Sequence, residues 1–593
     1  MRSLPFLFLA LSLVLFAGQS HSQTFTKVTD PTNPIVGDHF NSGGGSWADF
    51  NNDGYLDLFV ANGNDSSQNN SLYLNDRHGS FIKVSNGPLV HDGGTSIGGT
   101  WGDYNNDGSL DLFVTNRLFS TPFGNFFYQG AGDTAFAKIT AGRPATDAAN
   151  SNSSSWVDVD GDGNLDLFVV NFQGNNFLYY NSGPPSYTFT RVDTGSIVND
   201  GAAFSIVGAW ADYNNDGRPD LFIGNAGNQN DLLFTNNGGG KFSKSTFADG
   251  KSTLGASWGD YDNDGNLDLF VANYSGQTNI LYHNSGPPNY TLTPVDTGIA
   301  SNDAGNHVGS VWGDFNNDGN LDLFVCNDGG NNALYLNSGP PAYGFTKVTT
   351  GIVVNDPGTS FGCAAADFDN NGSLDLFVAN HLGGQNFLYL NNGNSNNWVN
   401  IKCAGTTVNR SAIGVKVRIK AAINGIPRWQ TQEVMAQTGY NSQNLWLHFG
   451  LGDAGMIDSV RIDWRPGVTE YYVNQPIDRL ITFTEGSGPA SVALSQPVIP
   501  AGYKILQNYP NPFNPSTTIS YDLPARSFVT IRVYDILGRD AGTLVNKIQE
   551  TGGHTVQWDG GLSSGLYLYR MEAVSVSDPT RRFVETKKME LLR

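Results

Sequence analysis

The sequence has little cysteine and little positive charge. Three cysteines among 593 residues cannot build a disulfide framework, and at most one bridge can form among Cys326, Cys363 and Cys403. Lysine and arginine number 33 against 54 acidic residues, which gives a net charge of −21. Because phosphate repels so acidic a chain, nucleic acid and anionic membranes are disfavoured as partners. With 12% aromatic residues and 72 glycines, the composition favours turn-rich β-structure over disorder.

Long hydrophobic runs are missing as well, except at the N-terminus. Residues 1–22 combine a basic start at Arg2, an apolar stretch from Leu4 to Gly18 and small residues before Gln23, which predicts a cleaved signal peptide. This stretch is short for a membrane span, so no transmembrane anchor is expected. The sequence therefore predicts a secreted protein that meets extracellular calcium.

One pattern recurs seven times, at spacings of 48 to 55 residues. Each copy contains D-x-[DN]-x-[DN]-G-x-x-D, followed by an apolar strand such as Leu56–Val60 and a second strand such as Leu72–Leu74. Four short strands per copy, with Gly, Asn and Pro turns between them, are typical of a propeller blade. A tryptophan stands two residues before the loop in six copies and is expected to pack between blades, whereas the seventh copy has Ala365.

The last strand of each copy also occurs once before the first loop, as Phe25–Val28, and no such segment follows Asn391. We expect the N-terminal segment to supply the missing strand of the seventh blade, because an incomplete ring would leave an open sheet edge. The predicted fold is all-β: a seven-bladed β-propeller followed by two small β-sandwich-like domains.

The acidic loops predict calcium sites. Positions 1, 3, 5 and 9 carry Asp or Asn, position 7 offers a backbone carbonyl, and Gly at position 6 permits a sharp turn. These are hard oxygen ligands, and no Cys or His is placed to favour zinc or copper. An EF-hand is excluded because position 12 is Val or Ile and not Glu. Ordinary Asx-Gly turns would explain one such loop, but seven copies are hard to explain without a cation.

About seven structural Ca²⁺ ions are therefore predicted, since clustered aspartates repel each other unless they are neutralised. The predicted ligands are Asp49, Asn51, Asp53, Tyr55 and Asp57; Asp103, Asn105, Asp107, Ser109 and Asp111; Asp158, Asp160, Asp162, Asn164 and Asp166; Asp212, Asn214, Asp216, Arg218 and Asp220; Asp260, Asp262, Asp264, Asn266 and Asp268; Asp314, Asn316, Asp318, Asn320 and Asp322; and Asp367, Asp369, Asn371, Ser373 and Asp375.

Over roughly residues 24–392, the Asp-rich loop followed by Leu-Asp-Leu-Phe-Val resembles the FG-GAP/VCBS repeats of integrin α-subunit propellers and of many bacterial surface proteins. The resemblance implies calcium with a structural role, held in a β-hairpin. It does not imply a particular ligand.

Residues 398–485 lose the period and predict a separate β domain. Asn409–Gly414, Gly439–Gln443 and His448–Gly452 resemble the ASPIC/UnbV domain, and a propeller with this domain is the arrangement of the cartilage-acidic-protein-like (CRTAC-type) family. Its Arg410, Gln443 and His448 either line a pocket or, as polar residues more often do, satisfy turns and strand ends.

The C-terminal part predicts export. Residues 486–502 form a Ser-, Pro- and Gly-rich linker. Residues 503–593, with Tyr509–Ile519 and Val533–Arg539, resemble the sorting domain of the bacterial type IX secretion system. This implies the type IX machinery as a partner, passage through the outer membrane after signal-peptide cleavage, and a secreted or cell-surface location.

Two functions fit these domains, 23–397 for the propeller and 398–485 for the second unit. The favoured one is a non-enzymatic binding or adhesion module for an extracellular glycan or protein, which acts through the loops opposite the calcium. The alternative is a secreted polysaccharide-processing lyase or hydrolase. The sequence has no recognised catalytic motif, although His381 with an Asp could form an acid/base pair. Seven Asn residues that end the second strands could bind a polar ligand there, but turn capping is the favoured role.

Overall fold

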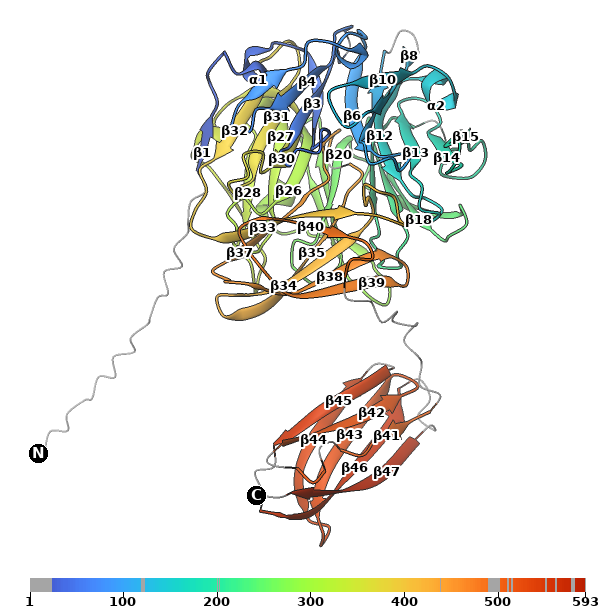
Figure 1. The fold of residues 1–593 in the computed structure, drawn as a ribbon, viewed down its shortest axis with the longest axis vertical. Helices are drawn as coiled ribbons and strands as arrows, with labels where there is room; N and C mark the ends of the chain where they lie inside the picture. Colours follow the sequence, from blue (N-terminus) through green and yellow to red (C-terminus); the bar gives the residue numbers. More distant parts are fainter. Residues whose placement is uncertain are drawn as a thin grey trace, which may run out of the picture. The chain divides into compact units, whose positions relative to one another are not determined.

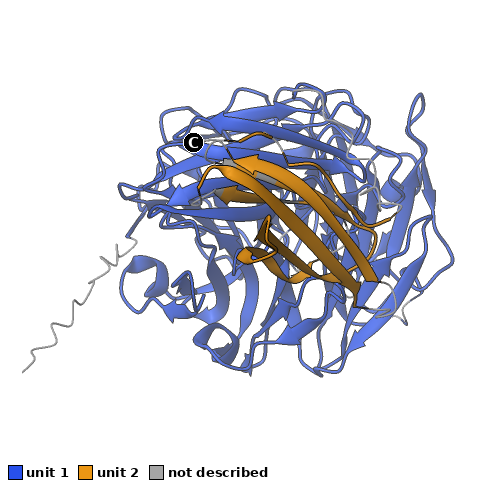
Figure 2. Ribbon diagram, turned by 90° about the horizontal axis from the view of Figure 1, so that it is seen from below, with its two compact units in different colours: residues 1–491 blue, residues 492–593 orange. Residues whose placement is uncertain are grey.

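The computed structural model describes residues 24–488 except 65, 119–122, 200, 202 and 438, and residues 502–591 except 509–510, 514–515, 550–551, 560–562 and 577–581. The predicted signal peptide and most of the predicted linker lie outside these ranges. Two compact units, residues 1–491 and 492–593, are distinguished in Figure 2.

The first unit contains seven antiparallel blades of four strands (Figure 1). The first strands contact those of neighbouring blades and so line the central channel. They are β2 (Ser42–Ala48), β6 (Ser96–Gly102), β12 (Ser151–Val157), β16 (Ser205–Ala211), β20 (Thr253–Gly259), β26 (His307–Gly313) and β30 (Gly358–Ala366). The second strands are β3 (Asp57–Asn62), β7 (Asp111–Asn116), β13 (Asp166–Asn171), β17 (Asp220–Asn225), β21 (Asp268–Asn273), β27 (Asp322–Gly330) and β31 (Asp375–Asn380).

The outer half of each blade consists of its third and fourth strands. The third strands are β4 (Ser71–Asn75), β9 (Phe126–Gly130), β14 (Phe177–Asn181), β18 (Asp231–Asn236), β23 (Ile280–Asn284), β28 (Ala333–Asn337) and β32 (Phe387–Asn391). The fourth strands are β5 (Phe81–Lys83), β10 (Phe136–Ile139), β15 (Phe189–Arg191), β19 (Phe242–Phe247), β24 (Leu292–Pro294), β29 (Phe345–Lys347) and β1 (Phe25–Lys27).

Short elements lie in the connections between blades. They are α1 (Pro34–Gly37), α2 (Arg143–Thr146), α3 (Ile299–Asn302), η1 (Pro88–Val90), η2 (Ile352–Val354), β8 (Phe123–Gly124), β11 (Ala148–Ala149), β22 (Gln277–Thr278) and β25 (Ala304–Gly305).

The N-terminal strand closes the ring, as the sequence predicts. Phe25 pairs with Asn391 and Lys27 with Tyr389, so that β1 becomes the outermost strand of the seventh blade. The Lys27 ammonium also lies 2.6 Å from Asp356.

The repeated tryptophans pack between blades, as expected. Trp47 stacks on Phe368 of the preceding blade and donates its indole N–H to Ala364 O at 3.4 Å. Trp156, Trp258 and Trp312 likewise donate to the first strand of the preceding blade, at 3.1 to 3.2 Å. These four indoles thus remove a large apolar area from water and also satisfy their polar atom, whereas the N–H groups of Trp101 and Trp210 have no hydrogen-bond partner among the described residues.

The Asn residues that end the second strands cap turns, which confirms the favoured prediction. Each donates its side-chain N–H to a carbonyl in the connection to the third strand, at distances between 2.7 and 3.2 Å. The seven residues are Asn62, Asn116, Asn171, Asn225, Asn273, Asn327 and Asn380. Their amide groups are therefore engaged in the turns.

Residues 397–484 fold into two packed sheets, one of three strands and one of four. Their strands are β33 (Asn397–Ala404), β34 (Lys416–Ile423), β35 (Ile426–Glu433), β37 (Leu447–Gly452), β38 (Ile457–Arg465), β39 (Val468–Gln475) and β40 (Leu480–Thr484). An eighth strand, β36 (Gln443–Asn444), belongs to neither sheet. The sequence treats this part as a separate domain, but it belongs to the same compact unit as the propeller. The physical reason is that β36 leaves the sandwich and pairs with β2 of the first blade.

The second unit is also a sandwich of a three-stranded and a four-stranded sheet. Its strands are β41 (Lys504–Ile505), β42 (Ser516–Leu523), β43 (Ser527–Asp535), β44 (Asp540–Gln549), β45 (Gly552–Asp559), β46 (Gly565–Ser575) and β47 (Arg582–Leu591). The three cysteines all lie in the first unit, buried and unbridged.

Candidate metal centres in the seven acidic loops

Each acidic loop joins the first strand of a blade to the second, and its first carboxylate organises the turn. In the first blade, Asp49 Oδ1 accepts hydrogen bonds from the N–H groups of Asp53 and Gly54, at 2.8 and 3.3 Å. Gly54 has a φ of +85°, which glycine adopts without strain. In all seven loops the position-1 carboxylate accepts from the N–H of the position-6 glycine, so the loops share one fold.

The last carboxylate of each loop begins the second strand and is buried. Asp57, Asp220 and Asp375 are at most 1% exposed. One carboxylate oxygen of each accepts a backbone N–H from the third strand, at 2.7 to 2.8 Å. The other oxygen has no hydrogen-bond partner among the described residues. A buried oxygen without a partner is costly, and a cation in the loop would satisfy it.

The pKa values of these carboxyl groups also indicate a missing positive charge. Burial, with a contribution from neighbouring loop carboxylates, raises the pKa of Asp57 and Asp220 to about 8, and that of Asp111 and Asp166 to about 9. Without a cation these groups would hold protons at neutral pH, and a bound dication would take their place.

Two loops bring three predicted ligands within metal-binding distance of one another. One oxygen each of Asp158, Asp160 and Asp166 lie within 4.8 Å of one another, and the same holds for Asp260, Asp262 and Asp268. These are positions 1, 3 and 9 of the third and fifth loops. An all-oxygen donor set of this kind fits a hard divalent cation.

A histidine that the sequence did not predict as part of a site lies beside the fifth loop. His283 Nδ1, on β23, lies 3.3 Å from Asp262 Oδ2 and 3.3 Å from Asp268 Oδ1, although no histidine was expected near a loop. The close approach of Asp268, with help from the other loop carboxylates, raises the pKa of His283 to about 9, which favours the imidazolium form at neutral pH. The sequence signal that could have revealed this histidine is its position in the third strand. Blades one and six have the apolar residues Leu74 and Leu336 at the same position.

In two further loops, lysine and arginine side chains form ion pairs with the loop aspartates. In the first blade, Lys402 Nζ lies 3.1 Å from Asp49, and Arg77 lies 2.9 Å from Asp53. In the fourth blade, Lys416 Nζ lies 3.2 Å from Asp212 Oδ2, and Arg218 pairs with Asp216. The seven loops are therefore not equivalent electrostatically.

The two-sheet domain covers the face of the propeller that carries these loops, and in Figure 1 its strands lie along one end of the blades. Every loop has a contact with it. The contacts, in blade order, are Asp49 with Lys402, Asp103 N with Ser411 Oγ, Gly163 with Thr407, Asp212 with Lys416, Asp260 with Thr431, Asn317 with His448, and Asp367 with Asn400.

One segment of this domain, residues 434–437 and 439–446, enters the central channel. Gln443 Oε1 accepts from Trp101 N at 2.7 Å, and its Nε2 donates to Trp101 O at 3.0 Å. Gly439 O accepts from Ala256 N at 3.4 Å. The Tyr440 ring lies 5.6 Å from that of Phe361. We call these residues the channel segment.

Of the three polar residues singled out in this domain, two satisfy buried groups. Gln443 bonds the backbone of β6, and His448 lies between Asn400 and Asn317, at 2.7 Å from each side-chain oxygen. Burial lowers the pKa of His448 to about 3, whereas only the imidazolium form could donate to both oxygens. Arg410 instead lines a cavity of about 360 Å³, together with Lys402 and Trp446.

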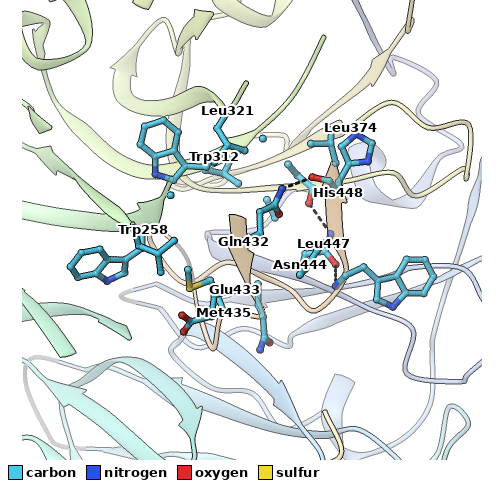
Figure 3. Close-up of a pocket in the computed structure, with 18 of the residues that line it drawn as sticks. Trp258, Trp312, Leu321, Leu374, Gln432, Glu433, Met435, Asn444, Leu447 and His448 are labelled. Atoms are coloured by element: carbon cyan, nitrogen blue, oxygen red, sulfur yellow. Dashed lines mark hydrogen bonds between the residues drawn. The ribbon is translucent and has the colours of Figure 1, made fainter. Parts of the chain in front are cut away.

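A second cavity, of about 100 Å³, lies between the domain and blades five to seven (Figure 3). Trp258 and Trp312 line it on the propeller side, and Gln432, Glu433 and His448 on the domain side. Burial raises the pKa of Glu433 to about 7, although Lys416 lies 3.7 Å away and opposes this.

The opposite face contains one acid/base pair of the kind anticipated from the sequence. His381 Nε2 lies 2.9 Å from Asp328 Oδ1, and Tyr274 donates its hydroxyl to Asp328 Oδ2 at 2.7 Å. Burial opposes ionisation, but these hydrogen bonds hold the pKa of Asp328 below its usual value. The three side chains come from blades seven, six and five.

Three families match parts of the chain. The FG-GAP-like repeat family matches residues 49–114, 158–223, 212–271, 260–325 and 314–378. The family described as ASPIC and UnbV matches residues 405–490, and the secretion system C-terminal sorting domain matches residues 507–584. Among the described residues, no helix has the length and apolar character needed to span a bilayer.

Individual relatives are more distant. Cartilage acidic protein 1 of Mus musculus is 28% identical over 354 residues, which cover 57% of this chain and 44% of that protein. An Agrocybe aegerita lectin that recognises non-reducing terminal N-acetylglucosamine has a TM-score of 0.37 and 15% identity, over 62% of this chain and 93% of its own. The V. cholerae biofilm matrix protein Bap1 has a TM-score of 0.29 and 11% identity, over 96% of this chain and 84% of its own. Both scores are too low to establish a shared fold.

Proposed function

Because this chain is an FG-GAP-repeat protein of the cartilage-acidic-protein-like arrangement, with an ASPIC/UnbV domain and a secretion sorting domain, we propose that it is a calcium-dependent recognition module outside the cell. The sorting domain marks it as a secreted protein. Delivery by the type IX machinery to a bacterial surface is part of the proposal.

Calcium is the ion that the loops would hold. The donors are carboxylate, amide and carbonyl oxygens, and the position-9 carboxylates of three loops have a buried oxygen with no partner among the described residues. A bound ion would neutralise these carboxylates and hold each loop in its turn. About seven ions per chain are expected, and isothermal titration calorimetry of the metal-free protein with Ca²⁺ measures this number directly.

The recognition role rests on one observation: the ASPIC/UnbV domain covers the face of the propeller that carries the acidic loops. The ASPIC/UnbV domain contacts all seven acidic loops, so this face of the propeller is occupied within the first unit. The opposite face has the connections between second and third strands and those between blades. Loops on a rigid scaffold are the usual place for recognition, and glycan or protein ligands are expected there.

The direct test is binding of the mature chain to arrays of glycans and extracellular matrix proteins, with Ca²⁺ and with chelator. We expect specific binding that is lost with chelator. A chain with all its calcium bound but with no ligand across the arrays would contradict the recognition role.

A matched pair of variants identifies the face. Leu382 is 74% exposed in a connection on the open face, and Ile426 is 57% exposed at the start of β35 in the ASPIC/UnbV domain. Leu382→Asp should weaken binding, whereas Ile426→Asp should not. The reverse result would place the ligand on the domain.

A second function has one specific observation in its favour, the triad of His381, Asp328 and Tyr274. A carboxylate that orients a histidine is a common arrangement for general acid/base catalysis. In that case the protein would cleave a bound polysaccharide, and His381→Gln would abolish product formation while leaving binding intact. We propose the non-enzymatic role first, because the triad lines neither of the two cavities described above.

A further inference from the structure

The ASPIC/UnbV domain is attached to the residues that would bind calcium. It reaches the position-1 residue in several loops: Lys402 binds Asp49, Lys416 binds Asp212, and Asn400 Nδ2 donates to Asp367 Oδ2 at 2.7 Å. Other contacts are to loop backbone, such as Gly452 N to Asn317 O at 2.8 Å and Lys416 Nζ to Asp212 O at 2.8 Å. Such contacts exist only while each loop keeps its present turn.

The channel segment is the part of the domain that depends most on this seating. Tyr440 forms a buried cluster with Ile97, Ile206 and Val308, which come from the second, fourth and sixth blades. Asn444 Nδ2 also donates to Ala365 O of the seventh blade, at 3.2 Å. A small tilt of the domain would break contacts with several blades together, because one segment touches them all.

The interface between domain and propeller combines shared apolar clusters with cavities and charged groups. Two cavities, of about 360 and about 100 Å³, lie within it, whereas protein interiors rarely contain voids larger than a water molecule. Charged side chains such as Lys402, Lys416 and Glu433 also contribute to it. The cavities and charged groups are the parts of this interface that can rearrange at the least cost in packing.

We propose that the ASPIC/UnbV domain is a calcium-dependent stopper of the propeller channel. This proposal depends on the calcium binding that is part of the proposed function. With ions bound, the seven loops keep their turns and the domain is seated. Without them, carboxylates as close as those of Asp158, Asp160 and Asp166 either repel each other or take up protons. In both cases the loops lose the ion that joins their ligands, the loops loosen, and the channel segment withdraws.

Hydrogen–deuterium exchange of the full mature chain, with Ca²⁺ and with chelator, tests this proposal. With chelator we expect exchange to rise at least tenfold in residues 434–446 and at the amides of Trp101 and Ala256, which donate to that segment. Strands β34 and β38, which pair inside the domain, should keep their protection. The midpoint in free Ca²⁺ should match the calorimetric binding curve.

Variants separate seating from calcium binding. Gln443→Ala removes both hydrogen bonds to Trp101 without touching a loop, so it should free the channel segment in saturating Ca²⁺ and leave the number of bound ions unchanged. Lys416→Met should shift release to higher Ca²⁺ by a few fold. Its matched control is Lys420→Met on the same strand, whose ammonium lies over Trp429 and away from the loops.

Each other outcome is informative. If Ca²⁺ binds and the channel segment stays equally protected with chelator, the stopper is refuted while calcium binding stands. If no Ca²⁺ binds, the calcium part of the proposed function fails. If chelation raises exchange in every blade strand alike, calcium holds the whole propeller together, and a separate release of the domain is refuted.

Discussion

At the scale of single residues, the last aspartate of each loop combines two roles. Asp375 is fully buried, and one oxygen supports the blade by accepting from Asn391 N at 2.8 Å. The other oxygen has no hydrogen-bond partner among the described residues, whereas in four other loops it accepts the N–H of the loop's second residue. The same side chain therefore supports the sheet and offers an oxygen to the proposed metal centre, which would explain why an acid is tolerated at a strand start.

Asp375→Asn should remove one calcium ion per chain, because it replaces one ligand oxygen by an amide nitrogen and still accepts from Asn391. The number of ions bound, from calorimetry or elemental analysis, measures the change. Asp193→Asn is the control, since Asp193 is 72% exposed and outside the loops. An unchanged number in Asp375→Asn would remove this residue from the ligand set.

His448 should make stability depend on pH. Burial lowers the pKa of His448 to about 3 in the folded protein, against 6.5 for an exposed histidine, because burial disfavours the imidazolium. The unfolded chain therefore binds the proton first, and the stabilisation by His448 is lost as pH falls below about 6.5. Relative to His448→Gln, the wild-type protein should lose about 2 kcal/mol between pH 7 and pH 5. Urea unfolding at both pH values measures this, and parallel pH profiles for the two proteins would contradict it.

At the scale of elements, the strand that closes the ring is a small part of the chain with a large effect. Val28 N donates to Leu388 O at 2.9 Å, just beyond the three paired residues of β1. Without this strand, β32 would become an exposed sheet edge, which favours aggregation.

Val28→Pro should therefore destabilise the protein by at least about 1 kcal/mol more than Val28→Ala, since only proline removes the N–H group. Thermal unfolding of the two variants gives the comparison, and light scattering reports aggregation through β32. Equal unfolding temperatures would mean that β1 contributes little to closure.

The blades and loops could be predicted because each repeat encodes its own turn. Asp49 to Asp57 lie within nine residues, so their spacing alone indicates a common centre. The position of the ASPIC/UnbV domain on the propeller could not be predicted from the sequence. A contact such as that of Lys416 with Asp212 joins residues 204 positions apart and has no periodic signal. His283 was missed for a related reason: its approach to Asp268 depends on pairing between strands and not on the loop pattern.

At the scale of the whole molecule, only one of the two units contains the loops that are predicted to bind calcium. All seven acidic loops lie in the first unit, and the second unit, residues 492–593, contains no copy of the loop pattern. Of the two β domains that the sequence separates from the propeller, only the C-terminal one forms a compact unit of its own.

Differential scanning calorimetry should therefore show two transitions, of which Ca²⁺ shifts only one. An ion that binds the native state alone raises its stability by about 2.7 kcal/mol per site at a hundred times its dissociation constant. A protein without residues 492–593 should keep the calcium-sensitive transition at the same temperature. A single transition, or a shift of both, would mean that the units unfold together.

The closing strand also has a consequence in time. Thr26 and its neighbour Asn392, on the two sides of the closure, are 366 residues apart. At about 5–20 residues per second, the ribosome completes the second side roughly 20–70 s after the first. Throughout that interval a finished strand has no partner, so every nascent chain must protect it until the ring can shut.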